Sequence, residues 1–159
     1  MIIGSREMMC VNDEIKKKNY KGVALNNECA TFRKQNKCKF YNAKNQGGGF
    51  KKEERIMDLE EIVTELKNCN SCPYYFSKRH VSISDIVFMP YNYITDENIR
   101  GTLNIRNKDT GEDVSIVNNN ILIFDEAHNI EKCAEEGSSF SFSAEDLKEF
   151  NKEIEKVGN

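Results

Sequence analysis

The sequence predicts an α/β fold built around a parallel sheet. The apolar run at 121–124 is too continuous for a half-exposed strand and is typical of a central strand in a parallel sheet. A second apolar run at 86–89 ends at Pro90, which stops a strand. Between and around these runs lie segments with helical periodicity, the clearest of them at 55–68.

The N-terminal half is predicted to be mainly helical. Residues 1–5 resemble the end of a buried strand that leads into a turn, and residues 10–45 read as short helical turns. Apolar residues in the next segment recur at spacings of three and four, which predicts an amphipathic helix. They are Ile56, Leu59, Val63 and Leu66. Pro73 then suits the first turn of a further helix.

Two more elements are predicted in the C-terminal half. Polar and apolar residues alternate around a Thr-Gly pair within 100–119, which indicates a surface hairpin. Ser143 followed by Asp146 is close to a capping box and predicts the start of a helix. Its apolar face would consist of Leu147, Phe150, Ile154 and Val157.

Composition and charge exclude some classes of protein and favour others. We expect no signal peptide and no membrane span, because the start lacks an apolar core and no run of about 18 apolar residues occurs. The six cysteines then indicate a reducing compartment, in which clustered thiols bind metal or stay free. The net charge of −3 divides into +7 over residues 1–55 and −10 over 56–159, and the basic part favours a polyanionic partner.

An acidic pair follows the most hydrophobic run. Asp125 and Glu126 come directly after it, at the strand end where ligands bind in open α/β sheets. In a Walker B motif, the aspartate holds Mg²⁺ and the next acid orients the attacking water. The alternative is a pair of acids that start the next helix and are favoured by its dipole. His128 completes the string Asp-Glu-Ala-His, which favours the Walker B interpretation.

Five motifs occur in an order that resembles one helicase family. They are GSREMMC, CKFYN, CPYYFSKR, IVFMPYNYI and IFDEAHNIEKC. Together they resemble the XPD-like iron–sulfur DNA helicases of superfamily 2. The resemblance implies a RecA-like P-loop motor domain that carries a mostly helical iron–sulfur insertion, and ATP-dependent movement from 5′ to 3′ on DNA.

The same resemblance implies a division of the chain. Residues 1–9 would be the edge of the first motor domain, 10–80 the iron–sulfur domain, 81–137 the motor domain with the DEAH motif, and 138–159 the start of an arch insertion. The 100–119 segment is longer than its counterpart in similar helicases. The sequence contains no Gly-Lys-Ser/Thr phosphate loop. The family order places that loop before Met1 and other motifs after Asn159, so we expect a part of a longer helicase that is inactive alone.

Four cysteines correspond to the ligands of a 4Fe–4S cluster in similar helicases. They are Cys10, Cys29, Cys38 and Cys72, and thiolates are the ligands that such clusters require. Cys69 departs from the family pattern and forms a Cys-x-x-Cys pair with Cys72, which leaves a zinc site as an alternative. Cys133 is expected to be a structural or free thiol.

Basic and aromatic residues near the cysteines are candidates for DNA binding. Cationic side chains neutralise phosphates, and aromatic rings stack on the bases of a single strand. The predicted positions are Arg6, Tyr74, Lys37 and Lys39. The alternative is that the lysines form a solvated surface and the tyrosines belong to the core, which we expect for Phe40 and Tyr75.

The resemblance also implies roles and partners. Asp125 would hold the Mg²⁺ of Mg-ATP, Glu126 would activate water, and His128 would couple the nucleotide to the DNA-binding surface. Single-stranded and forked DNA, ATP, and replication or repair proteins would be partners in the nucleus, in DNA repair, recombination and telomere maintenance. The rival interpretation is a non-catalytic DNA-binding module with an iron–sulfur cluster or zinc and a vestigial nucleotide site.

Overall fold

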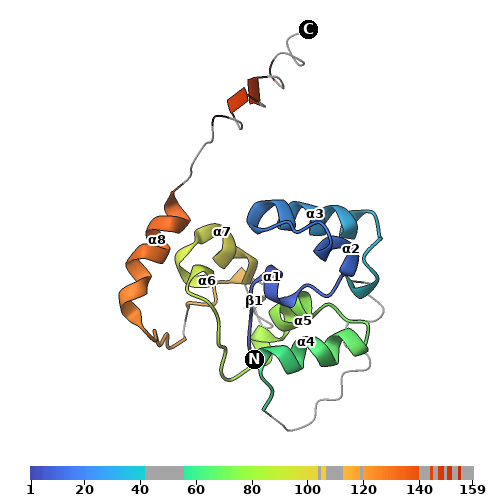
Figure 1. Ribbon diagram of the computed structural model, residues 1–159. Helices are drawn as coiled ribbons and strands as arrows, with labels where there is room; N and C mark the ends of the chain where they lie inside the picture. Colours follow the sequence, from blue (N-terminus) through green and yellow to red (C-terminus); the bar gives the residue numbers. More distant parts are fainter. Residues whose placement is uncertain are drawn as a thin grey trace.

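The computed structural model describes residues 1–41, 56–103, 105–106, 113–118 and 120–139, together with helical residues at 144, 147, 148, 150, 151 and 154. Helices predominate (Figure 1). The α-helices are α1 (Arg6–Met9), α2 (Asp13–Lys16), α3 (Gly22–Lys34), α4 (Leu59–Asn68), α5 (Pro73–His80), α6 (Asn92–Thr95), α7 (Glu97–Arg100) and α8 (Ile130–Ser138). Short 3₁₀ helices are η1 (Lys39–Tyr41), η3 (Val81–Ile83), η4 (Gly101–Leu103) and η5 (Ala127–Asn129).

The predicted α/β fold with a parallel sheet is wrong for the described part of the chain. Its one sheet has two strands, β1 (Ile105–Arg106) and β2 (Asp113–Val114), which pair antiparallel. This pair confirms the predicted hairpin, whose turn lies outside the described residues. Parallel pairing among the described residues is limited to one bridge between Ile2 and Phe88. Two backbone hydrogen bonds form it: Ile3 N donates to Phe88 O, and Phe88 N donates to Met1 O, both at 2.9 Å.

The run at 121–124 explains the error. It has no strand assignment, and Ile121 and Ile123 are each 90% exposed. Continuous apolar character reports a preference for burial, but a strand also needs neighbours that satisfy its backbone N–H and C=O groups. The described residues supply no such neighbour for this run. Hydrophobicity alone therefore predicted a sheet that is not formed.

Two helix predictions are confirmed, with one correction. Helix α5 has Pro73 in its first turn, as predicted. Helix α4 begins later than its periodicity indicated, because Asp58 caps it and forms a capping box with Glu61. Ile56 therefore lies outside the helix and is fully exposed, whereas Ile62, which the predicted face omitted, is buried with Leu66.

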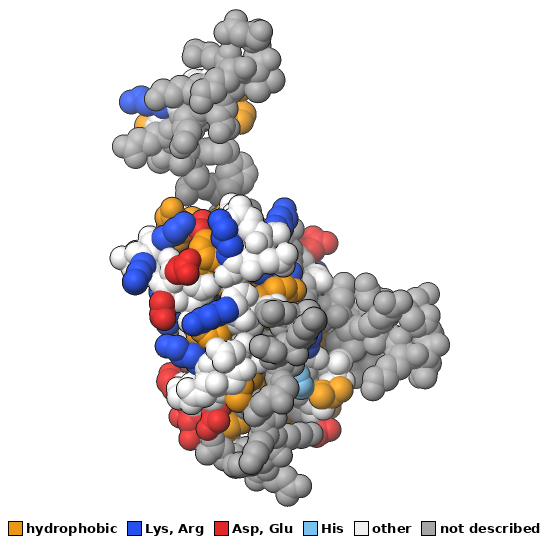
Figure 2. All heavy atoms as spheres, turned by 90° about the vertical axis from the view of Figure 1, so that its right-hand side faces the viewer, with side chains coloured by type: hydrophobic (Ala, Val, Ile, Leu, Met, Phe, Trp, Pro, Cys, Tyr) orange, Lys and Arg blue, Asp and Glu red, His pale blue; other side chains and the backbone are white. Residues whose placement is uncertain are grey.

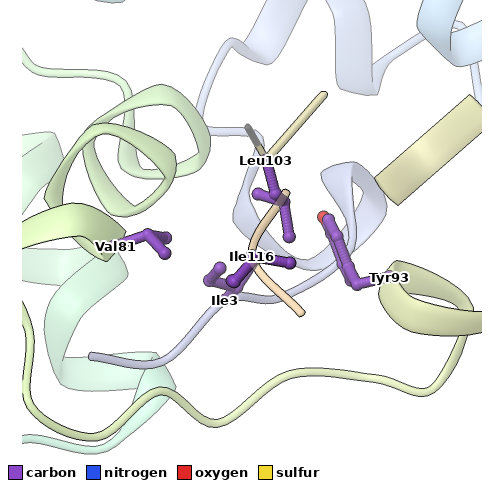
Figure 3. Packing of buried hydrophobic residues seen from close by; sticks show 5 residues of the cluster. All are labelled: Ile3, Val81, Tyr93, Leu103 and Ile116. Atoms are coloured by element: carbon purple, nitrogen blue, oxygen red, sulfur yellow. The ribbon is translucent and has the colours of Figure 1, made fainter. Parts of the chain in front are cut away.

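One apolar cluster joins segments that are distant in sequence. The buried side chains of Ile3, Val81, Tyr93, Leu103 and Ile116 converge, as Figure 3 shows. The hydroxyl of Tyr93 donates to the carbonyl oxygen of Gly4 at 3.1 Å. This cluster fixes the start of the chain, from which α1 leads to the first predicted cysteine ligand.

A second cluster lies between the N-terminal helices and includes thiols. Its buried members are Cys10, Ile15, Leu25, Cys29 and Phe32, with Cys38 and Tyr75 packed against them. In Figure 1, helices α1 to α5 lie on one side of the molecule, and α6, α7 and α8 lie on the other. None of the described helices is long and apolar enough to cross a membrane.

Several predictions concern residues outside this description. Ser143 and Asp146, the predicted cap of the last helix, are among them, although residues 144, 147, 148, 150, 151 and 154 are helical. The predicted domain boundaries stay predictions.

Candidate metal centre and nucleic-acid groove

Four cysteines from four segments line one cavity. Cys10 follows α1, Cys29 lies within α3, Cys38 precedes η1 and Cys72 caps α5. These are the four predicted cluster ligands, so the structure brings all of them together. The four segments are far apart in the sequence and meet only through folding.

Two of these cysteines are positioned by the same kind of helix end. Two residues after the end of α3, Asn36 has a left-handed backbone (φ 54°), and two residues after the end of α4, Asn70 has the same conformation (φ 52°). Asparagine tolerates this backbone better than most residues and commonly follows a helix. In both cases the next residue donates its N–H back to the helix, from Lys37 to Phe32 O and from Ser71 to Leu66 O. The following residue, Cys38 or Cys72, then enters the cavity.

The cavity is small and largely apolar. Its volume is about 10 Å³, space for roughly one water molecule, and Val11, Ile15 and Phe40 contribute to its lining. In the described part of the chain, no group of three or more His, Cys, Asp or Glu side chains is arranged to hold a single metal ion. The four thiols therefore line a common cavity without converging on one point.

Burial favours the protonated form of three of these thiols, Cys10, Cys29 and Cys72. Desolvation raises the pKa of Cys10 and of Cys29, and it raises the pKa of Cys72 to about 11. The positive charges of Arg6 and Arg33 partly oppose this effect on the pKa of Cys29. Because a thiol must lose its proton to bind metal, loading this site would release protons.

The two remaining cysteines lie elsewhere. Cys69 directly follows α4 as its C-cap and lies outside the cavity, in the position that Gln35 occupies after α3. The Sγ of Cys133, in α8, lies 3.6 Å from Thr95 Oγ1 in α6. Neither residue joins the four-thiol group.

A network of arginines and tyrosines surrounds the cavity. Arg33 Nη1 donates to the Tyr75 hydroxyl at 2.6 Å, and Nη2 donates to the Tyr41 hydroxyl at 2.8 Å. Arg6 Nη2 donates to the same Tyr75 hydroxyl at 3.2 Å, and Nη1 donates to Asn26 Oδ1. The guanidinium of Arg33 also lies 4.0 Å from the centre of the Tyr41 ring. Each cysteine-bearing segment therefore contributes one member of the network.

A large groove adjoins the cavity. Its volume is about 990 Å³, and it shares Arg6, Tyr74 and Tyr75 with the cysteine cavity. Four of its lining residues are cationic, namely Arg6, Arg33, Lys78 and Arg79. Glu7 is its one acidic lining residue among those described. The groove is therefore predominantly positive where it borders the thiols.

The predicted DNA-binding residues divide between two places. Arg6 and Tyr74 line the groove, and Tyr74 is only 8% exposed because Arg6 and Lys78 lie over its ring, at 4.3 and 4.8 Å from the ring centre. Lys37 and Lys39 are exposed, lie just after α3 in the sequence, and line neither the groove nor the cysteine cavity. Figure 2 shows basic side chains, mixed with acidic ones, on the face on which α2 and α3 lie. Phe40 is buried, as expected for a core residue.

Several contributors are not among the four positions predicted to bind DNA, although Arg33 and Lys78 belong to the basic residues near the cysteines. Arg33 and Lys78 lie four residues after Cys29 and Tyr74, so each shares a helix face with a predicted residue. This four-residue spacing is visible in the sequence once Cys29 or Tyr74 has been identified as a site residue. Asn12, which contacts Cys38, has no comparable signal.

The DEAH residues form an exposed turn. Glu126 has a left-handed backbone (φ 48°), and its carbonyl oxygen accepts from the N–H of Asn129 at 3.0 Å. His128 Nδ1 lies 3.4 Å from Glu126 Oε2, with both side chains exposed. Asp125 borders an apolar cavity of about 340 Å³ between 87–91 and 121–124. The turn thus presents two carboxylates and an imidazole to solvent.

Comparison with known proteins identifies the family. Residues 1–147 match the DEAD_2 family. The regulator of telomere elongation helicase 1 of Homo sapiens is 35% identical over 147 residues, which cover 92% of this chain and 11% of that protein. The Mus musculus protein is 35% identical over 151 residues (92% and 11%), and the Anopheles gambiae homolog is 34% identical over 154 (92% and 14%).

The chain spans 11–14% of the length of these relatives. No solved structure matches it. The match nevertheless extends through the cysteine segments and the DEAH turn, the two places at which the sequence resembled XPD-like helicases. The chain therefore belongs to the DEAD_2 family, among the XPD-like helicases that include regulator of telomere elongation helicase 1.

Proposed function

We propose that this chain is the part of an ATP-dependent 5′–3′ DNA helicase that binds single-stranded DNA beside a 4Fe–4S cluster. One observation carries the proposal: four thiols from four segments line a cavity that shares Arg6, Tyr74 and Tyr75 with a large basic groove. The family membership supports the helicase activity. The similarity to regulator of telomere elongation helicase 1 supports a nuclear role in telomere maintenance, with DNA repair and recombination as further roles.

The donor set fits an iron–sulfur cluster. Cys10, Cys29, Cys38 and Cys72 would hold it as thiolates, the usual four ligands of such clusters. When bound, the cluster would cross-link the four segments that meet here. The cavity of about 10 Å³ would have to widen, so loading would move the four thiols apart. Arg6 and Arg33 are placed to offset the negative charge that the thiolates acquire.

The groove fits a single strand of DNA. Phosphates would be bound by Arg6, Lys78 and Arg79, which line it. Tyr74 lies beneath two of these cations, so it would orient Arg6 and Lys78 in addition to any stacking on a base. The groove borders the cysteine cavity, and DNA binding would therefore depend on the fold of the cysteine segments.

The DEAH turn would serve nucleotide hydrolysis in a longer protein that also supplies a phosphate loop. Asp125 would coordinate the Mg²⁺ of Mg-ATP, and Glu126 would orient the attacking water. His128, beside Glu126, would couple this site to the DNA-binding groove. Replication and repair proteins would be partners of that longer protein.

Binding of labelled single-stranded DNA tests the proposal. We expect Arg6→Ala and Lys78→Ala each to weaken binding and to lower the dependence of log Kd on log salt by about 0.7, the value for one lost phosphate contact on a single strand. Lys67→Ala is the matched control, since Lys67 is exposed on α4 and lies outside the groove. Fluorescence anisotropy over a range of salt concentrations gives both quantities.

The outcome separates a specific groove from a general basic surface. Equal weakening by the Arg6, Lys78 and Lys67 variants would mean that DNA follows overall charge. Unchanged binding in both groove variants would contradict the proposed DNA site.

A further inference from the structure

Asn12 is a buried polar residue with two tasks. It lies two residues after Cys10 and is 6% exposed. As the N-cap of α2, its Oδ1 accepts from Glu14 N at 3.0 Å and from Ile15 N at 3.4 Å. These two bonds fix which end of the amide is the oxygen, because backbone N–H groups can only donate.

The other end of the amide faces a predicted cluster ligand. With Oδ1 occupied by the helix, Nδ2 points into the cysteine cavity and donates to Cys38 Sγ at 3.5 Å. Of the four cysteines, Cys38 lies in the connection between α3 and η1, whereas Cys10, Cys29 and Cys72 lie within or next to α-helices. A hydrogen bond from another segment therefore matters more for the position of Cys38 than for the positions of the other three cysteines.

We propose that Asn12 is a positioning residue that holds Cys38 through an N–H···S hydrogen bond and tunes the bound cluster. This inference rests on the proposed function, because it assumes that Cys38 is a ligand. Hydrogen bonds to the ligand sulfurs are one of the factors that set the reduction potential of an iron–sulfur cluster. A donor stabilises the more negative, reduced state, so its loss makes the potential more negative.

Three variants separate the two tasks of Asn12. Asn12→Ser keeps a good N-cap oxygen, since serine and asparagine cap helices about equally well, but it lacks the second branch that reaches Cys38. Asn12→Ala loses both the cap and the donor. Asp58→Ala removes the N-cap of α4, a helix without a predicted ligand, and controls for the loss of a helix cap in general.

The experiment measures iron and potential in the chain loaded with iron and sulfide without oxygen. We expect Asn12→Ser to lose iron to a chelator about tenfold faster than the unchanged chain, because removing an outer-shell partner of a metal ligand typically lowers metal affinity by about 10–100-fold. Its midpoint potential should shift to more negative values, while its apo form unfolds at the same temperature. Asp58→Ala should lower the unfolding temperature and leave the potential unchanged.

Two results would overturn the inference. One is an Asn12→Ser protein with the potential and iron retention of the unchanged chain. The other is an equal effect in Asp58→Ala, which would reduce the role of Asn12 to stability. If the unchanged chain itself takes up no iron, the proposed cluster fails and this inference fails with it, so the two failures are distinguishable.

Discussion

Arg33 should be a main source of stability in the metal-free protein. Its guanidinium donates to Tyr75 at 2.6 Å and to Tyr41 at 2.8 Å, and so joins three of the cysteine-bearing segments. We therefore expect Arg33→Ala to destabilise the metal-free chain strongly, although Arg33 is only partly buried.

The magnitude follows from the contacts. Hydrogen bonds to a charged group contribute about 1.5–3 kcal/mol each, and the lower end applies to a half-exposed site. Two such bonds give about 3 kcal/mol. The contacts with the rings of Tyr41 and Tyr75, at 4.0 and 4.4 Å from their centres, add about 0.5–1 kcal/mol. The expected loss of unfolding free energy is therefore about 3–4 kcal/mol, a large part of the stability of a small domain.

Urea unfolding of the metal-free chain, followed by circular dichroism, measures this loss. Lys34→Ala is the matched control, since Lys34 is the next residue of α3 and is exposed, and its change should stay within about 0.5 kcal/mol. Arg33→Lys should lose most of the same free energy, because an ammonium cannot reproduce the two-pronged geometry. A loss below about 1 kcal/mol in Arg33→Ala would refute the reasoning.

Two further predictions concern the ligands and the packing beside them. Cys72→Ser should lose the bound iron, because a hydroxyl is a poor substitute for a soft thiolate, while Cys69→Ser should keep full iron content. Iron analysis of both variants measures this difference. The reverse pattern would show that the fourth ligand is assigned wrongly. Gly4→Ala should destabilise the chain by about 1–3 kcal/mol, since its methyl group would lie 3.1 and 3.3 Å from side chains of α1 and α4. Gly101→Ala, with open space around it, is the control for thermal unfolding, and equal effects would contradict the packing argument.

Part of the fold could be predicted because its signals are local. Helix α5 follows from Pro73, and the β1–β2 hairpin follows from alternation around a turn. The start of α4 is set by a capping box, and periodicity alone placed it too early. Ile56 was therefore assigned to the apolar face of α4 although it lies before the helix. The parallel sheet was predicted wrongly, because apolar residues at 121–124 indicate a preference for burial and carry no information about a partner strand.

The sequence predicted which four cysteines come together, but not the residues that surround them. Cys38 and Cys72 follow an asparagine by two residues, and that helix-ending pattern is visible in the sequence. The partners of Arg33 are 8 and 42 residues away, and Asn12 contacts a residue 26 positions later. Contacts of that kind depend on how the helices pack, which no local pattern records.

The four-thiolate cluster is tested by metal analysis of the chain purified without oxygen. We expect a brown protein with about four iron and four sulfide per chain, and loss of this content when any one of Cys10, Cys29, Cys38 and Cys72 is replaced by serine. A colourless protein with stoichiometric zinc, or one that binds no metal after reconstitution with iron and sulfide, would contradict it.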